Sequence, residues 1–356
     1  MTALPPGSTI GILGGGQLGR MLAMAAAQLG YRCHIYAPPG DNVACEVAAS
    51  WTIAEYHDLA ALKDFADSCD VVTFEFENVP VDPLKSIIGL VPIHPPLTAL
   101  EVAQDRVVEK EFVRKLGGET AAFAVARTEI EVEDAVAAVG TPAILKTIRM
   151  GYDGKGQVRV SAQSELASAW RRAGGQPLIA EAMVRFEAEF SVILVRGTDG
   201  EIRYWDSSRN VHEDGILATS CLPSGPLIES QQVAARKMAG DVADALDYVG
   251  VFTAEFFASA EGPLFNEIAP RVHNSGHWTI EGAETSQFEN HIRAICGLPL
   301  GSTATIADRV EMQNLIGDDG ERWVQLFGDP AANVHLYGKA EARPGRKIGH
   351  VTRLYR

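Results

Sequence analysis

The feature that most constrains how this 356-residue chain can fold is a pair of acidic residues in one predicted hairpin. Two apolar runs, Val251–Ala258 and Leu264–Ile268, flank a Glu-Gly-Pro sequence, which predicts two strands joined by a tight turn. A turn centred near Glu261 places Glu255 opposite Glu267, and opposed side chains on one face of a sheet lie roughly 5 Å apart. Because two carboxylates at that separation repel each other, the hairpin is expected to hold a cation.

The hairpin predicts a site for a hard divalent cation such as Mg²⁺. Proteins hold Mg²⁺ through one or two carboxylates together with substrate phosphates. Polar side chains crowd into the residues that follow: Arg271, His273, Asn274, Ser275 and His277. Cations, imidazoles and amides beside a metal are typical of a site that holds an anion and moves protons. The alternatives are a shifted turn that leaves one Glu solvated, and a loop of satisfied polar side chains.

The composition is that of an ordinary globular protein, with 46% hydrophobic and 22% charged residues. The length predicts two or three domains. A net charge of -15 argues against a general nucleic-acid or membrane-surface binder. No apolar run reaches the ~20 residues of a membrane span, and the N-terminus lacks a signal-peptide pattern, so we expect a cytoplasmic protein. The five cysteines are scattered without a CxxC pair, which indicates neither a disulfide framework nor a zinc site.

A glycine-rich loop follows the first predicted strand, Thr9–Leu13. Gly14, Gly16 and Gly19 match the GxGxxG spacing of dinucleotide-binding loops, and an Ala/Met/Leu-rich helix follows them. A dinucleotide site also needs an acidic residue after the next strand, where this chain has Tyr36-Ala-Pro-Pro. We therefore interpret the loop as a helix N-terminus that accepts an anionic ligand other than NAD.

The remaining elements of this region predict a Rossmann-like domain of α/β type. Glu75 and Asn78 lie at the carboxyl end of a buried strand, where ligands bind in open α/β sheets. The predicted elements are helix Leu59–Ser68, strand Val71–Phe76, helix Val81–Ile88 and strand Leu90–Ile93. The sequence His94-Pro-Pro then predicts a linker.

Beyond the linker, a charged helix is predicted over Thr98–Gly117. We interpret Lys110 on this helix as solvated and leave Arg106 open between solvent and a ligand. Lys146 lies within the apolar strand Ala143–Ile148, and because a buried ammonium without a partner is costly, it is predicted to face an anion.

A second glycine-rich segment runs from Gly151 to Gln157 and enters the strand Val158–Val160. It lacks the GxxxxGK[ST] pattern, and its position between strands fits a hairpin whose backbone N–H groups cover phosphates. Strands are also predicted over Leu178–Val184 and Phe190–Val195, and a packing helix over Glu229–Tyr248.

The C-terminal segment is basic in an otherwise acidic chain. Six cations there face Glu341 alone: Lys339, Arg343, Arg346, Lys347, Arg353 and Arg356. Because Pro344-Gly345 lies between cations, we interpret the segment as an ordered phosphate-binding lid rather than a solvated tail.

Taken together, these segments resemble the ATP-grasp superfamily and, within it, the 5-(carboxyamino)imidazole ribonucleotide synthases. The resemblance covers almost the whole chain. The matching segments are GGGQLGRM at 14–21, TFEFENVP at 73–80, AQDR at 103–106, GYDGKGQ at 151–157, NEIAPRVHNSGHWT at 266–279, and HLYGK with RPGRKIGHV near the end. The HNSGH and RPGRK segments distinguish this branch from the related transformylase and biotin carboxylase.

The resemblance implies an α/β and α+β fold with four parts. These are a Rossmann-like preATP-grasp domain over 1–97, a small ATP-grasp lid domain over 98–180, the main ATP-grasp domain over 181–300, and a C-terminal subdomain with the basic phosphate-binding loop over 301–356.

It also implies an activity: ATP- and bicarbonate-dependent carboxylation of the exocyclic amine of 5-aminoimidazole ribonucleotide, by way of carboxyphosphate, in purine biosynthesis. Mg²⁺ would be the metal, and a homodimer without nucleic-acid or membrane partners is expected. The alternatives are another ATP-grasp carboxylate-amine ligase, an NAD-dependent oxidoreductase and a nucleotide-sensing module without turnover.

The resemblance assigns roles residue by residue. The residues implied to bind ATP are Arg106, Lys146, Gly151, Tyr152, Asp153, Gly154, Lys155, Gly156, Gln157, Glu181, Ala182, Met183, Val184, Glu189, His212, Asn266 and Glu267. The metal ligands are Glu255 and Glu267. The ribonucleotide would contact Gln17, Leu18, Glu75, Asn78, Asn274, Ser275, Lys339, Arg346 and Lys347. Arg271 would hold bicarbonate, and Tyr152, Asp153 and His273 would position the amine and transfer protons.

Overall fold

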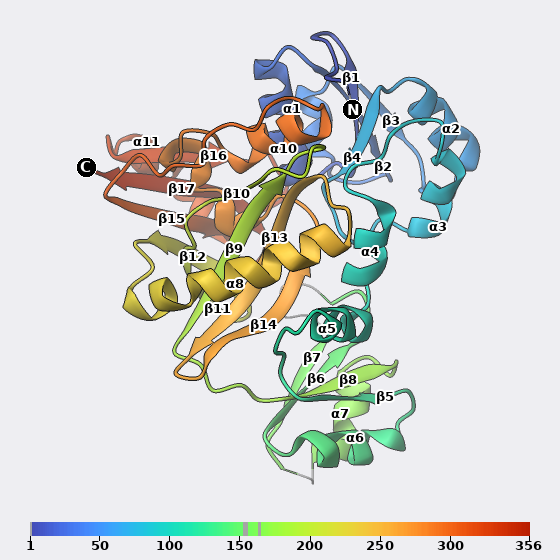
Figure 1. The fold of residues 1–356 in the computed structure, drawn as a ribbon, viewed down its shortest axis with the longest axis vertical. Coiled ribbons are helices and arrows are strands. Elements are labelled where there is room, and N and C mark those ends of the chain that lie inside the picture. Colours follow the sequence, from blue (N-terminus) through green and yellow to red (C-terminus); the bar gives the residue numbers. More distant parts are fainter. Residues whose placement is uncertain (1, 152–155, 163–164) are drawn as a thin grey trace.

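The protein folds around three β-sheets (Figure 1). A computed structural model describes residues 2–356 apart from 152–155 and 163–164. Within these residues, no helix is both long enough and apolar enough to span a membrane.

The N-terminal sheet is parallel, with strand order β3-β2-β1-β4, which confirms the Rossmann-like prediction. Its strands are β1 Thr9–Leu13, β2 Arg32–Ala37, β3 Ser50–Ile53 and β4 Val71–Phe74. The connecting helices are α1 Gln17–Gln28, η1 Val43–Val47, α2 Leu59–Asp67, α3 Val81–Leu84 and η2 Lys85–Ile87. The strand predicted over Leu90–Ile93 is wrong, because only isolated bridges such as Val72–Ile93 form there.

The helix predicted over Thr98–Gly117 is two helices, α4 Leu97–Ala103 and α5 Arg106–Lys115. The break falls at Asp105, whose extended backbone and carboxylate cap the N-terminus of α5 by accepting from two backbone N–H groups. Both helices share a core with the largest sheet.

The lid sheet is antiparallel, with order β5-β8-β6-β7, and lies at one end of the molecule (Figure 1). Its elements are β5 Phe123–Ala126, α6 Glu131–Val139, β6 Ala143–Thr147, β7 Gln157–Val160, α7 Leu166–Arg172 and β8 Leu178–Ala182. Pairing of β6 with β7 confirms that the second glycine-rich segment joins two strands.

The largest sheet has the order β14-β13-β9-β11-β12-β15-β17-β16, with β10 paired to β9. Its strands are β9 Ala188–Arg196, β10 Ile202–Tyr204, β11 Arg209–Glu213, β12 Ile216–Leu222, β13 Gly250–Ser259, β14 Gly262–Ala269, β15 Arg309–Ile316, β16 Ala332–Leu336 and β17 Lys347–Tyr355. The C-terminal strands β15, β16 and β17 thus extend this sheet.

The remaining helices cover this sheet or its ends. They are α8 Pro226–Ala245, η4 Asn274–Gly276, α9 Thr279–Gly282, α10 Gln287–Ile295, η5 Gly317–Arg322 and α11 Trp323–Phe327. Strand β9 alternates between two cores: Val192 and Leu194 pack with α8, while Ile193 and Val195 pack with α10 and α1. Because α1 belongs to the N-terminal domain, that second core joins the two domains.

The register of the predicted hairpin is confirmed. Strands β13 and β14 pair with Glu255 opposite Glu267, and the pairing shifts by a bulge directly after Glu255.

A buried histidine fastens the N-terminal domain to the largest sheet. The backbone N–H of Val251 in β13 donates to Nδ1 of His291 at 3.1 Å, so Nε2 carries the hydrogen and donates to Thr73 Oγ1 of β4 at 2.8 Å. Burial lowers the pKa of His291 to about 3. This junction therefore requires a neutral imidazole.

We predict that this histidine makes the protein sensitive to acid. Its pKa is lower in the folded than in the unfolded chain, so its contribution is complete above about pH 6.5 and is lost as the pH falls toward 3. At pH 5 the loss is about 2 kcal/mol for this group. Denaturant titrations should show the stability deficit of His291→Gln shrinking as the pH falls below 6.5. The exposed His57, changed to Gln, is the control; an unchanged deficit for His291→Gln would contradict the prediction.

Candidate active site

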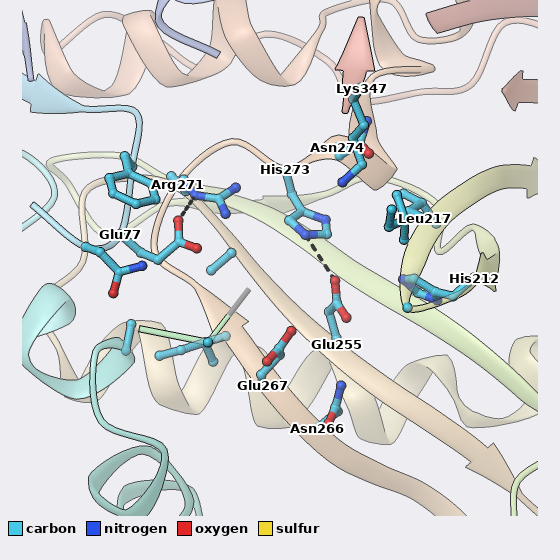
Figure 2. A pocket seen from close by; sticks show the side chains of 18 of the residues that line it. Glu77, His212, Leu217, Glu255, Asn266, Glu267, Arg271, His273, Asn274 and Lys347 are labelled. Carbon is cyan, nitrogen blue, oxygen red and sulfur yellow. Dashed lines mark hydrogen bonds and ion pairs between the residues drawn. The ribbon is translucent and has the colours of Figure 1, made fainter. Parts of the chain in front are cut away.

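One cavity of about 850 Å³ is lined by residues of the lid sheet, of the largest sheet and of the N-terminal domain, which contributes the start of α1 and the segment after β4. The carboxyl groups of Glu255 and Glu267 point into the same part of it, with Arg271 and His273 above them (Figure 2). The other predicted residues that line it are Gln17, Leu18, Glu75, Asn78, Arg106, Lys146, Gly151, Gln157, Glu189, His212, Asn266, Asn274, Lys339, Arg346 and Lys347. Tyr152, Asp153, Gly154 and Lys155 lie outside the described residues.

Glu267 is held by a cation from α5. Arg106 Nη1 lies 2.8 Å from Glu267 Oε2, and Nη2 of the same guanidinium donates to the carbonyl of Gly151 at 3.2 Å. Burial disfavours the charged carboxylate, but Arg106 and the nearby lysines outweigh it and lower the pKa of Glu267 to about 2. Glu267 is therefore an anion at neutral pH.

The two opposed carboxylates fit Mg²⁺, which needs oxygen ligands and takes the rest from water or phosphate. Among the described residues no cluster of three or more His, Cys, Asp or Glu could hold a metal ion. Water or substrate phosphate would supply the remaining oxygens of a Mg²⁺ held at Glu255 and Glu267.

Two lysines share one buried carboxylate at the edge of the cavity. Glu181 accepts from Lys146 at 2.8 Å and forms an ion pair with Lys110 at 3.3 Å. Burial opposes ionisation of Glu181, yet Lys146 and Lys110 lower its pKa overall. The prediction that Lys146 faces an anion is confirmed.

The interpretation of Lys110 as solvated is wrong. The residue is 1% exposed, and its ammonium also donates to the backbone carbonyl of Asn266 at 3.0 Å. Burial lowers its pKa, which the neighbouring carboxylates oppose. The sequence carried a signal for this: Arg106, Glu109, Lys110 and Val113 are spaced as one helix face, and all four are buried.

Glu109 is a cavity residue that the sequence analysis missed. Its carboxylate accepts from the backbone N–H of Ile268, the neighbour of Glu267, at 2.7 Å. Burial raises the pKa of Glu109 to about 8, against the opposing effect of Lys110. It therefore ties α5 to the strand that carries Glu267.

Arg271 is fixed by an acidic residue that was also missed. Its Nε lies 2.5 Å from Glu77 Oε2, and both side chains line the cavity (Figure 2). Burial alone would favour neutral Glu77, but Arg271 lowers the pKa of that carboxyl. Glu77 follows Glu75 by two residues after strand β4, so its place in the same TFEFENVP segment was the available signal.

His273 joins the hairpin that carries Glu255 to the loop beyond it. Its Nε2 lies 3.0 Å from Glu255 Oε1, and its Nδ1 lies 2.8 Å from Ser275 Oγ. Ser275 is fully buried and does not line the cavity, so the prediction that it contacts the ribonucleotide is not supported by its position. It lies behind His273 instead.

A side chain of the protein itself, Glu75, occupies the glycine-rich loop before α1. Glu75 accepts from the backbone N–H of Gly16 at 2.6 Å and of Gly19 at 2.9 Å. A Cβ at Gly14 would meet Glu75 Cγ at 2.5 Å, which is too close for a side chain. The helix N-terminus that we expected to accept an anionic ligand thus holds an internal carboxylate.

The basic loop between β16 and β17 closes the cavity from the C-terminal side. Arg346 Nη2 lies 2.6 Å from Asp41 Oδ2 of the N-terminal domain, and Lys339 donates to the carbonyl of Lys347 at 2.7 Å. Burial, with nearby Arg346, lowers the pKa of Lys339 to about 8.

On the lid side several residues that the resemblance implied to bind ATP lie outside the cavity wall. Gly156, Glu181, Ala182, Met183 and Val184 do not line it, whereas Phe186 does. Beyond them, Glu189 and His212 line the cavity and form an ion pair. Burial lowers the pKa of His212, but the bond to Glu189 prevails and raises it.

Three family models match successive parts of the chain. They are a ribonucleotide synthetase preATP-grasp domain over residues 7–104, an ATP-grasp domain over 111–288, and a phosphoribosylaminoimidazole carboxylase C-terminal domain over 311–356.

The chain is 49% identical to an N5-carboxyaminoimidazole ribonucleotide synthase from Brucella melitensis, over 99% of this chain and 98% of that protein. It is similar to the crystal structure of the synthetase from Thermus thermophilus, with TM-score 0.90 and 46% identity over 97% of this chain and 93% of the other. A structure from Aspergillus clavatus, in complex with ADP and 5-aminoimidazole ribonucleotide, gives TM-score 0.91 and 32% identity over 98% and 94% of the two chains. The chain therefore belongs to the N5-carboxyaminoimidazole ribonucleotide synthase family, a branch of the ATP-grasp enzymes.

Proposed function

We propose that this protein uses ATP and bicarbonate to carboxylate the exocyclic amine of 5-aminoimidazole ribonucleotide, releasing ADP and phosphate. The observation that carries the proposal is the opposed pair Glu255 and Glu267 in one cavity with Arg271 and the basic C-terminal loop. The family relatives support it, because one of them is described with ADP and this ribonucleotide bound.

ATP is proposed to lie between the lid sheet and the hairpin. Arg106 and Lys146 line this part of the cavity and carry the positive charge that phosphates need. Both cations now face carboxylates, Glu267 and Glu181. Phosphates would therefore enter a site whose cations are already in place, which reduces the reorganisation needed on binding.

The ribonucleotide is proposed to lie against the N-terminal domain and beneath the basic loop. Gln17, Asn78 and Asn274 supply polar groups there, while Lys339 and Arg346 supply cations for its phosphate. On binding, Arg346 would either leave Asp41 for the phosphate or contact Asp41 and the phosphate together.

Arg271 is proposed to hold bicarbonate. Its guanidinium is fixed by Glu77 on one side and reaches the cavity that also contains Glu255 and Glu267. Bicarbonate is a poor electrophile, so phosphorylation by ATP to carboxyphosphate is the step that makes its carbon reactive toward the amine. Fixed cations stabilise the charge that develops on the transferred phosphoryl group.

Mg²⁺ is proposed to bind at Glu255 and Glu267. When bound with ATP, it supplies charge neutralisation on the phosphates. Glu109 would keep Glu267 in place for it, because the carboxylate of Glu109 holds the backbone N–H of the next residue. We also infer a cytoplasmic location, because ATP and nucleotide monophosphates are substrates of that compartment.

The first experiment measures ADP release with Mg²⁺, ATP and bicarbonate, with and without 5-aminoimidazole ribonucleotide. Strong stimulation by the ribonucleotide is expected. ADP formation that the ribonucleotide does not stimulate would indicate another ATP-grasp ligase. Binding of ATP without turnover would indicate a sensing module. A change in NADH fluorescence on titration would indicate an oxidoreductase. We expect Glu267→Gln to lower the rate at least ~100-fold, because it removes one of the two carboxylates proposed to hold the Mg²⁺ that neutralises charge on the transferring phosphoryl group. Glu261→Gln, exposed at the turn of the same hairpin, is the matched control.

A second prediction concerns Lys110. Lys110→Met keeps the buried volume but removes one cation from Glu181 and the hydrogen bond to the carbonyl of Asn266. The free energy of unfolding should fall by roughly 2 kcal/mol, because a buried acceptor loses its partner. Lys115→Met changes an exposed lysine of the same helix and should leave the free energy of unfolding unchanged. Chemical denaturation of both variants tests this, and equal stability of the two would refute the importance of the buried pair.

We further propose a homodimer formed through the N-terminal sheet. Strand β3 is an edge strand, and it exposes 57% of Trp51 and 44% of Ile53. An uncovered edge with large apolar side chains favours pairing with another chain. Light scattering should give twice the 38.2 kDa of one chain, and Trp51→Glu should shift the mass toward the monomer. A monomeric parent protein would remove this proposal.

A further inference from the structure

We propose that Asn314, a buried residue of β15, is a positioning residue that fixes the orientation of the Asn274 side-chain amide in the cavity. Asn274 lines the cavity, whereas Asn314 is not among the described residues that line it. The role that we derive for Asn274 toward the ribonucleotide rests on the proposed function. The orientation of its amide does not.

The two asparagines form a closed pair of amides. Nδ2 of Asn274 donates to Oδ1 of Asn314 at 2.9 Å, and Nδ2 of Asn314 donates to Oδ1 of Asn274 at 2.8 Å. Each amide therefore uses one of its N–H hydrogens and one lone pair of its oxygen on the other amide. Turning either amide over would set nitrogen against nitrogen and oxygen against oxygen, so both bonds would be lost together.

A backbone carbonyl determines the orientation of Asn314. Its Nδ2 also donates to the carbonyl oxygen of Leu217 in β12 at 2.7 Å. A carbonyl oxygen can only accept, so the opposite orientation of the Asn314 amide would place two oxygens against each other. The main chain thus sets the orientation of Asn314, and the amide pair passes it on to Asn274.

Asn314 lies where two strands of the largest sheet separate. The pairing of β12 with β15 ends at Thr219 opposite Gln313. The next residue of β15 is Asn314, and its side chain continues the contact with β12 through the carbonyl of Leu217. Asn314 is 3% exposed, so water has little access to these bonds. One buried side chain therefore joins β15 both to β12 and to the loop that carries Asn274.

A second buried amide holds the backbone of that loop. Gln287 of α10 is fully buried; its Oε1 accepts from the backbone N–H of His273 at 2.8 Å, and its Nε2 donates to the carbonyl of the same residue at 2.6 Å. A Cβ at Gly276 would lie 2.8 Å from Gln287 Oε1, so the loop packs closely onto this amide. The backbone beside Asn274 is thus held by α10 and its side chain by β15.

The consequence is a fixed pattern of hydrogen-bonding groups at the cavity wall, where Figure 2 shows Asn274. After pairing with Asn314, the Asn274 amide keeps one N–H hydrogen and one lone pair of its oxygen for a ligand. The phosphate and hydroxyl groups of a ribonucleotide offer oxygens that accept from an N–H group. With the amide reversed, its own oxygen would take the place of the nitrogen and repel a phosphate oxygen. Asn314 therefore acts on ribonucleotide binding through Asn274.

A double-variant experiment tests whether Asn314 acts only through Asn274. Asn314→Leu has a side chain of similar size but no polar group. We expect it to raise the KM of the ribonucleotide roughly 10-fold, with little change in kcat or in the KM of ATP. The double variant Asn274→Ala/Asn314→Leu should bind the ribonucleotide no more weakly than Asn274→Ala alone. Effects that multiply in the double variant would overturn the proposal. Gln313→Leu, at the exposed neighbouring position of β15, is the matched control and should leave this KM unchanged.

Asn314→Asp keeps the proposal testable if Asn314→Leu does not fold. Its carboxylate has the shape of the amide but only accepts, so the Asn274 amide meets one oxygen with its own oxygen in either orientation. The same rise in the KM of the ribonucleotide is expected, and it should disappear in the Asn274→Ala background. A direct repulsion between the new carboxylate and the phosphate would persist in that background, and that result would contradict the proposal.

A measurement without turnover separates this proposal from the proposed function. NMR of protein labelled with nitrogen-15 in its asparagine side chains, with the Asn274 signal assigned by Asn274→Ala, reports how fast the amide hydrogens of Asn274 exchange with water. We expect slow exchange in the parent protein and exchange at least ~10-fold faster in Asn314→Leu, because the pair that protects the amide is lost. Equal rates in the two proteins would overturn the proposal. If the ribonucleotide does not stimulate ADP release by the parent protein, the proposed function fails, while the exchange rates still decide whether Asn314 holds Asn274.

Discussion

The buried ion pairs along helix α5 are the interaction on which the rest of the site depends. Charged groups inside a protein are tolerated only when opposite charges and hydrogen bonds compensate their lost hydration. Three cations form ion pairs with two carboxylates here, Arg106 with Glu267 and both Lys110 and Lys146 with Glu181, and the carboxyl group of Glu109 lies beside them. They come from α5, the lid sheet and the hairpin, so the same contacts that balance the charge also place the three parts around one cavity.

The local sequence pattern was sufficient to predict most helices and strands and the acidic hairpin. Apolar runs separated by a turn signal fixed the pairing of Glu255 with Glu267, because register in a hairpin follows from the turn. The prediction that Lys110 is solvated failed because its partner is distant in the sequence. A charged residue on a helix is solvated by default, and only the partner Glu181, 71 positions later in the sequence, makes its burial favourable. Glu77 and Glu109 were missed likewise, since their partners Arg271 and Ile268 are distant in sequence.

The glycine loop shows how a correct motif can serve a different purpose. Gly14 and Gly16 allow close approach of another group to the N-terminus of α1, which is the property a dinucleotide site uses. Here Glu75 makes that approach, and its carboxylate accepts the two backbone N–H groups. The glycine spacing indicates that another group approaches the backbone closely. It does not indicate whether that group belongs to a ligand or to a side chain of the protein.

Continuity of the largest sheet explains why the basic loop reaches the cavity. Strands β15 and β17 pair beyond β12, so the loop between β16 and β17 is anchored in the same sheet as the acidic hairpin. Asp41 of the N-terminal domain holds Arg346 of that loop, and His291 fastens the domain to β13. The two contacts lie on different elements, so the position of the loop over the cavity depends on the domain junction as well as on its own strands. A loop fixed in this way can present its cations to a phosphate without first having to fold around it.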